Sequence, residues 1–326
     1  MMQNTQDTQQ VEMVCLEDLV ADSHPYRCFK QLLSAEILFP LLAPVNKRLG
    51  RFGFGSERLF SCLLLQFMED LSDRELERYC QENTGSKWFC GFQLTENTAD
   101  HSVFCKARKR IGTERLSDIF SSIRNMLKSQ GYMSEVFTFV DACHLISKAN
   151  LWKERDKALQ EKYQKLNNDV LPKVAVDKQA RIGCKGNHKF GYGYKQQASV
   201  DMQRGLMNKV AIAPGNETDA QGFKRVCPNQ GAVYTDKGYC TQPAVIAAKQ
   251  KGCHLAAIKK NNMTGKNYDL DRWYSKIRAP YERVFSQRNP RVRSRGIEKN
   301  QFAAFMQAMG FNLKRLRVLH LEQAMA

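Results

Sequence analysis

Two short β-forming segments end in an aspartate, and this pattern restricts the fold more than any other feature of the chain. Val136–Val140 (VFTFV) runs into Asp141, and Ala232–Thr235 (AVYT) runs into Asp236, which a Lys-Gly turn follows. β-Branched and aromatic residues favour strands, and an acid at the exit of a strand can point into a cleft. One such acid is weak evidence, because aspartate also ends strands for turn chemistry.

The segments around these two strands predict an α/β fold with a mixed five-stranded sheet. Residues 189–201 and 206–214 are expected to form a hairpin that turns at Arg204-Gly205, and 253–258 is expected to form the last strand. Helices are expected over 219–226, 243–251, 268–285 and 297–316. If the first and fourth strands are neighbours in this sheet, Asp141 and Asp236 lie side by side.

A third acid, Glu282, lies in the segment RAPYERVF, within the helix expected over 268–285. If that helix packs against the same edge of the sheet, the Glu282 carboxylate can reach the two aspartates. Three carboxylates around one point repel each other unless cations lie between them. Two divalent metal ions roughly 3.5–4 Å apart fulfil this role, and they hold the attacking and leaving oxygens of a phosphodiester. Mg²⁺ suits such a site because it prefers carboxylate and water oxygens.

The first part of the chain has helical patterns instead. Apolar residues recur at helical spacing over 59–71, and Ser72 with Glu75 forms a capping box for the next helix. A third helix is expected over 100–111, with its basic side chains away from its apolar side. This order is compatible with a helix-turn-helix DNA reader, and a helical domain with a solvated basic face fits equally well. The basic residues are Lys106, Arg108, Lys109 and Arg110.

These patterns predict a helical DNA-binding or dimerisation domain over 14–131 and a catalytic domain over 132–320. A helix over 116–127 closes the first domain, and Gly131 stops it. Residues 1–13 are polar, and we expect them to be disordered. Within the catalytic domain, a Lys-rich surface insertion is expected at about 148–188.

The positive charge is confined to the second part of the chain. The net charge of the 326 residues is +17, but residues 1–140 hold 16 Lys and Arg against 18 Asp and Glu. Residues 141–326 hold 34 against 15. Such an uneven distribution of positive charge along the chain favours a polyanionic partner, most often nucleic acid, over a surface tuned for solubility.

Other features exclude several classes of protein. The 11 cysteines are odd in number, scattered and without a C-x-x-C pair, so they predict buried thiols in a reducing compartment rather than a disulfide framework or a zinc ribbon. No apolar run approaches the ~18–20 residues of a membrane span, and the polar N-terminus is no secretory signal. We therefore expect a cytoplasmic protein.

The motifs together resemble bacterial insertion-sequence transposases of the DDE type, which have a ribonuclease H-like core. The resemblance covers roughly residues 15–316. LSDRELERYCQENTGSKWFCGF and DHSVFCKARKRIG look like the N-terminal helical domain of that family, and KFGYGYKQQASVD looks like its Gly-Tyr-Lys strand. VDACHLISK, VYTDKGY and RAPYERVF carry the three acids Asp141, Asp236 and Glu282, and VYTDKGY is the most specific of these motifs.

The resemblance implies an enzyme that cuts the ends of its own element and joins them to target DNA. Asp141 and Asp236 would bridge two Mg²⁺ ions, which Mn²⁺ can replace, and Glu282 would complete the shell of the second ion. Two ends must be paired, which implies a homodimer on double-stranded DNA at the bacterial nucleoid. The residues expected to contact DNA outside the first domain are Lys237, Arg278, Arg288, Arg291, Arg293 and Arg295.

The chain departs from the family pattern beside Glu282. Tyr274 is one residue too far from Arg278 for the usual Tyr-x-x-Arg-x-x-x-Glu, and Asn289 stands where a Lys is usual. Two alternatives therefore stay open: a nuclease of the same fold without strand transfer, and a DNA-binding protein that no longer cuts. Three other acids are expected to have no catalytic role: Asp201 as a turn residue, and Asp177 and Asp219 as surface or cap residues.

Overall fold

The computed structural model describes residues 13–33, 35–43, 53–185, 189–286 and 290–324. The chain divides into two compact units, Met1–Arg110 and Ile111–Ala326. Arg288 and residues 1–12, for which DNA contact and disorder were expected, lie outside the described residues. Within the described residues, no helix combines the length and the apolar character that crossing a membrane requires.

The first unit is helical, as its sequence predicts. Its helices are α1 (Pro25–Leu32), α2 (Ala35–Leu42), α3 (Ser56–Met68), α4 (Asp73–Glu82), α5 (Thr84–Cys90) and α6 (His101–Ile111), whose last residue begins the second unit. The central helix α3 is covered on nearly every side, because Leu63, Leu64 and Leu65 are all fully buried. The predicted capping box is present: the Ser72 hydroxyl accepts from the Glu75 N–H, and the Glu75 carboxylate accepts from the Ser72 N–H.

The second unit contains one mixed six-stranded sheet. Its strands are β1 (Phe137–Ile146), β2 (Arg181–Lys185), β3 (Lys189–Asp201), β4 (Met207–Pro214), β5 (Ala232–Thr235) and β6 (His254–Ala257). The strand order is β2-β3-β1-β5-β6, and β4 also pairs with β3. β3 is antiparallel to its three partners, whereas β5 and β6 run parallel to β1. The expected neighbours, the first strand and the strand that ends before Asp236, are therefore adjacent.

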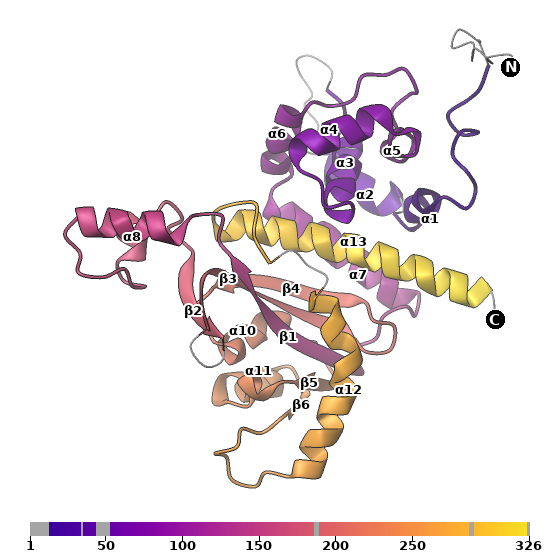
Figure 1. Cartoon of the computed structure of the whole chain (residues 1–326). Helices are drawn as coiled ribbons and strands as arrows, with labels where there is room; N and C mark the ends of the chain where they lie inside the picture. The colour runs from indigo at the N-terminus through magenta and orange to yellow at the C-terminus, as the bar shows by residue number, and fades with distance from the viewer. Residues whose placement is uncertain (1–12, 34, 44–52, 186–188, 287–289, 325–326) are drawn as a thin grey trace, which may run out of the picture. The chain divides into compact units, whose positions relative to one another are not determined.

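Helices cover both faces of this sheet (Figure 1), and the period of two along each strand decides what they contact. Val140 and Val233 are fully buried in one apolar cluster with residues of α10 (Asp219–Val226) and α11 (Gln242–Gln250). Their neighbours Phe139 and Tyr234 point to the opposite face, where they contact aromatic rings of α12 (Tyr268–Ser286). The long helix α13 (Ile297–Ala324) packs along β4 and beside α7 (Thr113–Ser129).

The structure confirms the α/β class and adds two details that we did not expect. β1 does not end at Asp141 but continues to Ile146, because the residues after the acid pair with β3. β2 is a sixth strand, inside the segment expected to be a surface insertion. That segment also holds α8 (Leu151–Gln160) and α9 (Leu171–Val174), which share a small apolar cluster of their own.

The division between the units lies about 20 residues before the boundary expected at 131. The helix expected over 116–127 is α7, and Gly131 follows it with a φ of +74°, in the left-handed region that favours glycine. However, α7 packs along α13, with the rings of Phe120 and Phe305 5.5 Å apart, so it belongs to the second unit.

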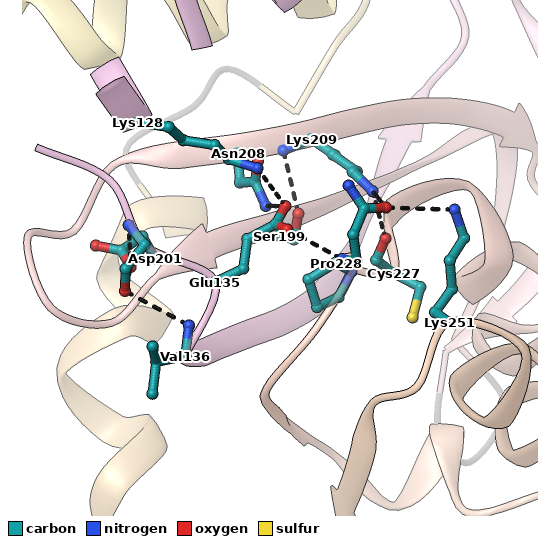
Figure 2. Close-up of polar contacts among 12 residues, drawn as sticks. Lys128, Glu135, Val136, Ser199, Asp201, Asn208, Lys209, Cys227, Pro228 and Lys251 are labelled. Carbon is teal, nitrogen blue, oxygen red and sulfur yellow. Dashed lines mark hydrogen bonds and ion pairs between the residues drawn. The ribbon is translucent and has the colours of Figure 1, made fainter. Parts of the chain in front are cut away.

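A buried glutamate fixes the start of β1 (Figure 2). Glu135 is 4% exposed and forms an ion pair of 2.8 Å with Lys128. The Asn208 side chain and the Asn229 backbone donate hydrogen bonds of 2.8 and 3.1 Å to the same carboxylate. Lys209 in turn donates to the Cys227 carbonyl at 2.6 Å. This network ties α7, β4 and the loop before β5 to β1, and so sets where the two acid-bearing strands begin.

Candidate active site

Asp141 and Asp236 lie beside each other at one edge of two parallel strands. β1 and β5 pair in the register Val140 with Thr235, so the next residue along each strand is an aspartate. β5 stops there and a short 3₁₀ turn, η2 (Lys237–Tyr239), begins. The Asp141 side chain is partly buried, whereas the Asp236 side chain is 54% exposed.

Glu282 reaches the same site from α12, which packs on β1 and β5 through aromatic contacts. The Tyr281 ring lies 6.2 Å from that of Phe139, and the Tyr274 ring lies 5.7 Å from that of Tyr234. The off-register Tyr274 is therefore a packing residue. One helical turn after it, α12 presents Arg278 and then Glu282, whose side chain is 58% exposed.

Arg278 connects the acids. Its guanidinium is 3.5 Å from an Asp236 carboxylate oxygen and 3.4 Å from one of Glu282. The side chain is only 6% exposed and lies over the Phe139 ring, 5.5 Å from its centroid. The structure thus places Arg278 among the carboxylates, although we expected it at the DNA. A DNA contact by Arg278 stays a prediction.

Burial dominates the electrostatics of Asp141. It raises the pKa of this carboxyl to about 6, with smaller contributions from the negative charges of Asp236 and Asp219. The Ala142 N–H, which donates to the carboxylate at 2.8 Å, and the nearby Arg278 oppose that rise in pKa. A carboxylate whose pKa is raised in this way favours the binding of a cation.

A fourth acid, Asp219, lies near these residues. It is in the first turn of α10, where a surface or cap role was expected, but the sequence did not predict that it lies near the two aspartates. Asp219 begins α10, and its carboxylate forms an ion pair of 2.8 Å with Lys195 of β3. Its other oxygen lies 2.7 Å from the point where a Cβ on Gly238 would be. Asp219 therefore supports the turn that follows Asp236. The signal that could have revealed it is the lysine of the Gly-Tyr-Lys strand, which needs a counter-charge where it is buried.

Tyr239 ends the turn after Asp236 and is fully buried. Its ring packs edge to face on Phe223 of α10, at 5.8 Å. Burial and the negative charges of Asp219, Asp141 and Asp236 raise the pKa of its phenol. Among the described residues its hydroxyl has no hydrogen-bond partner, which is costly for a buried polar group. A donor of this kind beside three carboxylates suits an acid cluster that holds a cation and its water.

The donor set fits a hard divalent cation, because it consists of carboxylate oxygens and excludes sulfur and imidazole. Within the described residues, the carboxylate oxygens of the three acids do not all lie within 4.8 Å of one another. Instead Arg278 spans Asp236 and Glu282 and supplies the positive charge that the pair needs.

The other acids have structural roles. Asp201 is buried and accepts a hydrogen bond of 2.9 Å from the Arg204 N–H, so the expected turn role is confirmed. Asp177 is not a surface residue: it is 2% exposed, and it accepts hydrogen bonds from Tyr194 at 2.6 Å and Ser147 at 2.9 Å. The expectation for Asp177 was wrong, because its two hydroxyl donors come from β3 and from the residue that follows β1.

The basic residues expected at DNA fall into two groups. Lys237, Arg291, Arg293 and Arg295 are exposed in the second unit, and Lys106, Lys109 and Arg110 are exposed on α6. Arg108 differs from them, because its guanidinium forms hydrogen bonds with Asp73, one of them at 2.9 Å, and with Gln66. It ties α6 to the neighbouring helices of the first unit.

The sheet order, the parallel pair of acid-bearing strands and the helix that carries a third acid define a ribonuclease H-like fold. Two family models match the chain: "Transposase domain (DUF772)" over residues 14–110 and "Transposase DDE domain" over residues 162–313. The second match contains Asp236 and Glu282, and Asp141 lies before it. The chain therefore belongs to the DDE transposases, which are DNA-cleaving and strand-transfer enzymes that use divalent metal ions.

Solved transposase structures show a distant likeness. A piggyBac transposase synaptic complex with hairpin DNA has 10% identity and a TM-score of 0.40, over 91% of this chain and 76% of the other. A pre-cleavage Mos1 transpososome has 9% identity and a TM-score of 0.18, over 81% and 96%. These likenesses are too weak to add to the family assignment. No curated protein matches the chain.

Proposed function

We propose that Asp141, Asp236 and Glu282 form the catalytic centre of an insertion-sequence transposase that cuts the ends of its own element and joins them to target DNA. The observation that carries this proposal is the register of β1 and β5, which brings two aspartates together beside a helix with the third acid. The basic charge of residues 141–326 supports a DNA substrate for the same unit.

The three acids would hold two Mg²⁺ ions, or Mn²⁺ in their place. Asp141 and Asp236 are adjacent and would hold the ions together with Glu282. Such ions polarise a phosphodiester and lower the pKa of a bound water. Arg278 would give up its ion pairs with Asp236 and Glu282 when cations bind, because the carboxylates then have stronger partners.

The chain's own residues would position the DNA for two successive steps. In the first, water attacks the phosphodiester at the element end and releases a 3′-OH. In the second, that 3′-OH attacks a phosphodiester of target DNA and displaces its 3′ oxygen, so no covalent protein intermediate forms. Lys237 is exposed next to Asp236, where it can hold a phosphate beside the reacting bond. Arg291, Arg293 and Arg295 would hold the flanking backbone.

Two element ends must be joined in one event, so we propose a homodimer on paired ends at the bacterial nucleoid. Light scattering of the protein with and without an end duplex tests the dimer. A complex with two chains and two duplexes is expected. One chain on each duplex at all protein concentrations would refute it.

A cleavage assay tests the catalytic centre. Purified wild type and Asp236→Ala are incubated with duplexes that carry the element's own ends, in Mg²⁺ or EDTA, and binding is measured in parallel. Nicking at the end is expected in Mg²⁺ with wild type only, while both proteins bind. Asp156→Ala is a matched control, because Asp156 is an exposed acid on α8. It should cut as wild type does.

Two other outcomes correspond to the alternative functions. Binding without any cutting by wild type would show a DNA-binding protein that no longer cuts, consistent with Arg278 in place between the acids. Cutting without joined products, when target DNA is supplied, would show a nuclease of the same fold.

A further inference from the structure

Three buried cysteines of the first unit meet at one point. Cys62 lies on α3, Cys80 on α4 and Cys90 at the end of α5, and they are 0%, 0% and 2% exposed. Their sulfur atoms all lie within 4.8 Å of one another. They are 28 residues apart at most, yet each comes from a different helix, so the packing of three helices brings the thiols together.

The spacing suits a single metal ion with three sulfur ligands. Three sulfurs that each lie about 2.3 Å from a central ion in one plane are about 4 Å from each other. The three helices would therefore have to close by less than about 1 Å, which rotation of the cysteine side chains can supply. Ordinary apolar packing of three thiols does not require this mutual contact, because each could pack against aliphatic neighbours instead.

The chemistry of the three sulfurs selects the kind of ion. Thiolates prefer soft ions such as Cu(I) and zinc. Zinc in a structural site takes four ligands, and among the described residues no fourth histidine, cysteine or carboxylate joins this group. Burial also keeps water from the fourth position. A three-coordinate site therefore favours Cu(I) over zinc.

One ammonium group lies close to the three thiols. Lys30 is close enough to Cys90 for its charge to act on the thiol, and it is held by a hydrogen bond of 3.1 Å to the Trp88 carbonyl. A monovalent ion, together with this ammonium, would offset most of the charge of the thiolates, whose protons pass to solvent on binding.

We propose that Cys62, Cys80 and Cys90 form a site for one Cu(I) ion, which would join α3, α4 and α5. The end of α5 would give the route of entry, since Cys90 precedes the exposed Gly91 at the C-cap, and local opening of this last turn would expose the thiols. The proposal is independent of the catalytic centre, because it concerns the other unit.

Anaerobic titration of the full chain tests the site, with Cu(I) supplied as its bicinchoninate complex. Native mass spectrometry should find one Cu(I) that the chain keeps against the chelator. Cys80→Ala and Cys62→Ala should lose affinity by on the order of a hundredfold or more, since each removes a ligand. The matched control replaces the exposed Cys15, Cys105 and Cys184 by Ala, and should keep the ion.

X-ray absorption of the wild-type protein loaded with Cu(I) keeps the test decisive if the alanine variants do not fold. Three sulfur neighbours at about 2.3 Å are expected. The proposal fails if wild type retains no Cu(I), or if the exposed-cysteine variant loses it. It also fails if Zn²⁺ displaces Cu(I) from the three cysteines.

Discussion

At the residue scale, the charge of Asp141 opposes the stability of the fold. Its carboxylate is partly buried, and Asp236 and Asp219 add negative charge nearby. Such a residue is kept for its chemistry, because a neutral side chain of the same shape would fit the fold better.

Asp141→Asn should therefore abolish cutting and raise the stability of the protein in EDTA. Because burial raises the pKa of Asp141 to about 6 in the folded state, above ~3.9 in the unfolded chain, ionisation destabilises the fold as pH rises between these values. The increase in the free energy of unfolding should be absent near pH 4 and reach roughly 1–3 kcal/mol at pH 7. Thermal unfolding of both proteins from pH 4 to 8 measures it. Equal stability of the two proteins at pH 7 would contradict the burial argument.

Gly238 provides a second test at this scale. A methyl group at this position would lie 2.7 Å from an Asp219 oxygen, so either Asp219 or the turn after Asp236 must move. Gly238→Ala should lower the cleavage rate by about tenfold or more, since small displacements of a catalytic group are costly. DNA affinity should stay within about twofold. Gly53→Ala, whose Cβ would meet nothing within 4 Å, is the control for the substitution itself. An unchanged cleavage rate would show that the turn tolerates the shift.

At the scale of elements, the stability of the sheet depends on the Glu135 network at the start of β1. Although burial alone would raise the pKa of Glu135, the ion pair with Lys128 and the hydrogen bonds from Asn208 and Asn229 lower it. A folded-state pKa below the unfolded value means that the network stabilises the fold above about pH 4.5 and is lost as pH falls through the folded pKa.

Glu135→Gln should lower the free energy of unfolding by roughly 1–3 kcal/mol at pH 7, because Lys128 loses its counter-charge and a backbone or side-chain donor loses its acceptor. Urea unfolding at pH 7 and pH 4 measures the effect, and the difference between the proteins should shrink at the lower pH. Glu154 is the matched control for a buried acid outside this network. A difference that grows as pH falls would reverse the sign of the argument.

Much of this element structure follows from the sequence, and the failures have local causes. The strands before Asp141 and Asp236 and the helix with Glu282 are predictable, because each has a clear period and a nearby turn signal. β2 is not, since RIGCK is short and lies in a Lys-rich stretch, and it is a strand only because β3 offers it an edge. The sequence also hides how closely β3 approaches β1: a side chain on Gly193 would lie 1.9 Å from the Leu145 carbonyl oxygen.

The candidate active site is likewise predictable from the sequence only in part. The two aspartates are predictable because acids at the ends of apolar strands need a reason to be there, and Glu282 is predictable from the motif RAPYERVF in its helix. The ion pair of Lys195 with Asp219 and the position of Arg278 depend on tertiary packing between segments that are distant in sequence. Only the i,i+4 spacing of Arg278 and Glu282 is visible in the sequence.

At the scale of the whole molecule, the distribution of charge should govern DNA binding. The excess of Lys and Arg lies in residues 141–326, and exposed arginines gather just after α12. Replacing Arg293 and Arg295 by Gln should weaken binding at all sequences and lower the slope of log affinity against log salt by about 2. Fluorescence anisotropy from 50 to 300 mM salt, as an order-of-magnitude range, measures the slope. Replacing the exposed Lys153 and Arg155 of α8 is the control, and an equal change in slope there would show diffuse attraction instead.

The extension of β1 beyond Asp141 sets the distance between the first acid and the arginine-bearing segment after α12. The strand ends at Ile146, whose N–H donates to the Pro290 carbonyl at 2.7 Å and whose carbonyl accepts from the Val292 N–H at 2.9 Å. Asp141 and the arginine-bearing segment are therefore both attached to the strand β1, a few residues apart along it. If the arginines bind the DNA backbone, the distance between the bound phosphates and the cleaved phosphodiester would be set by β1. That distance would stay constant whatever bases lie between them.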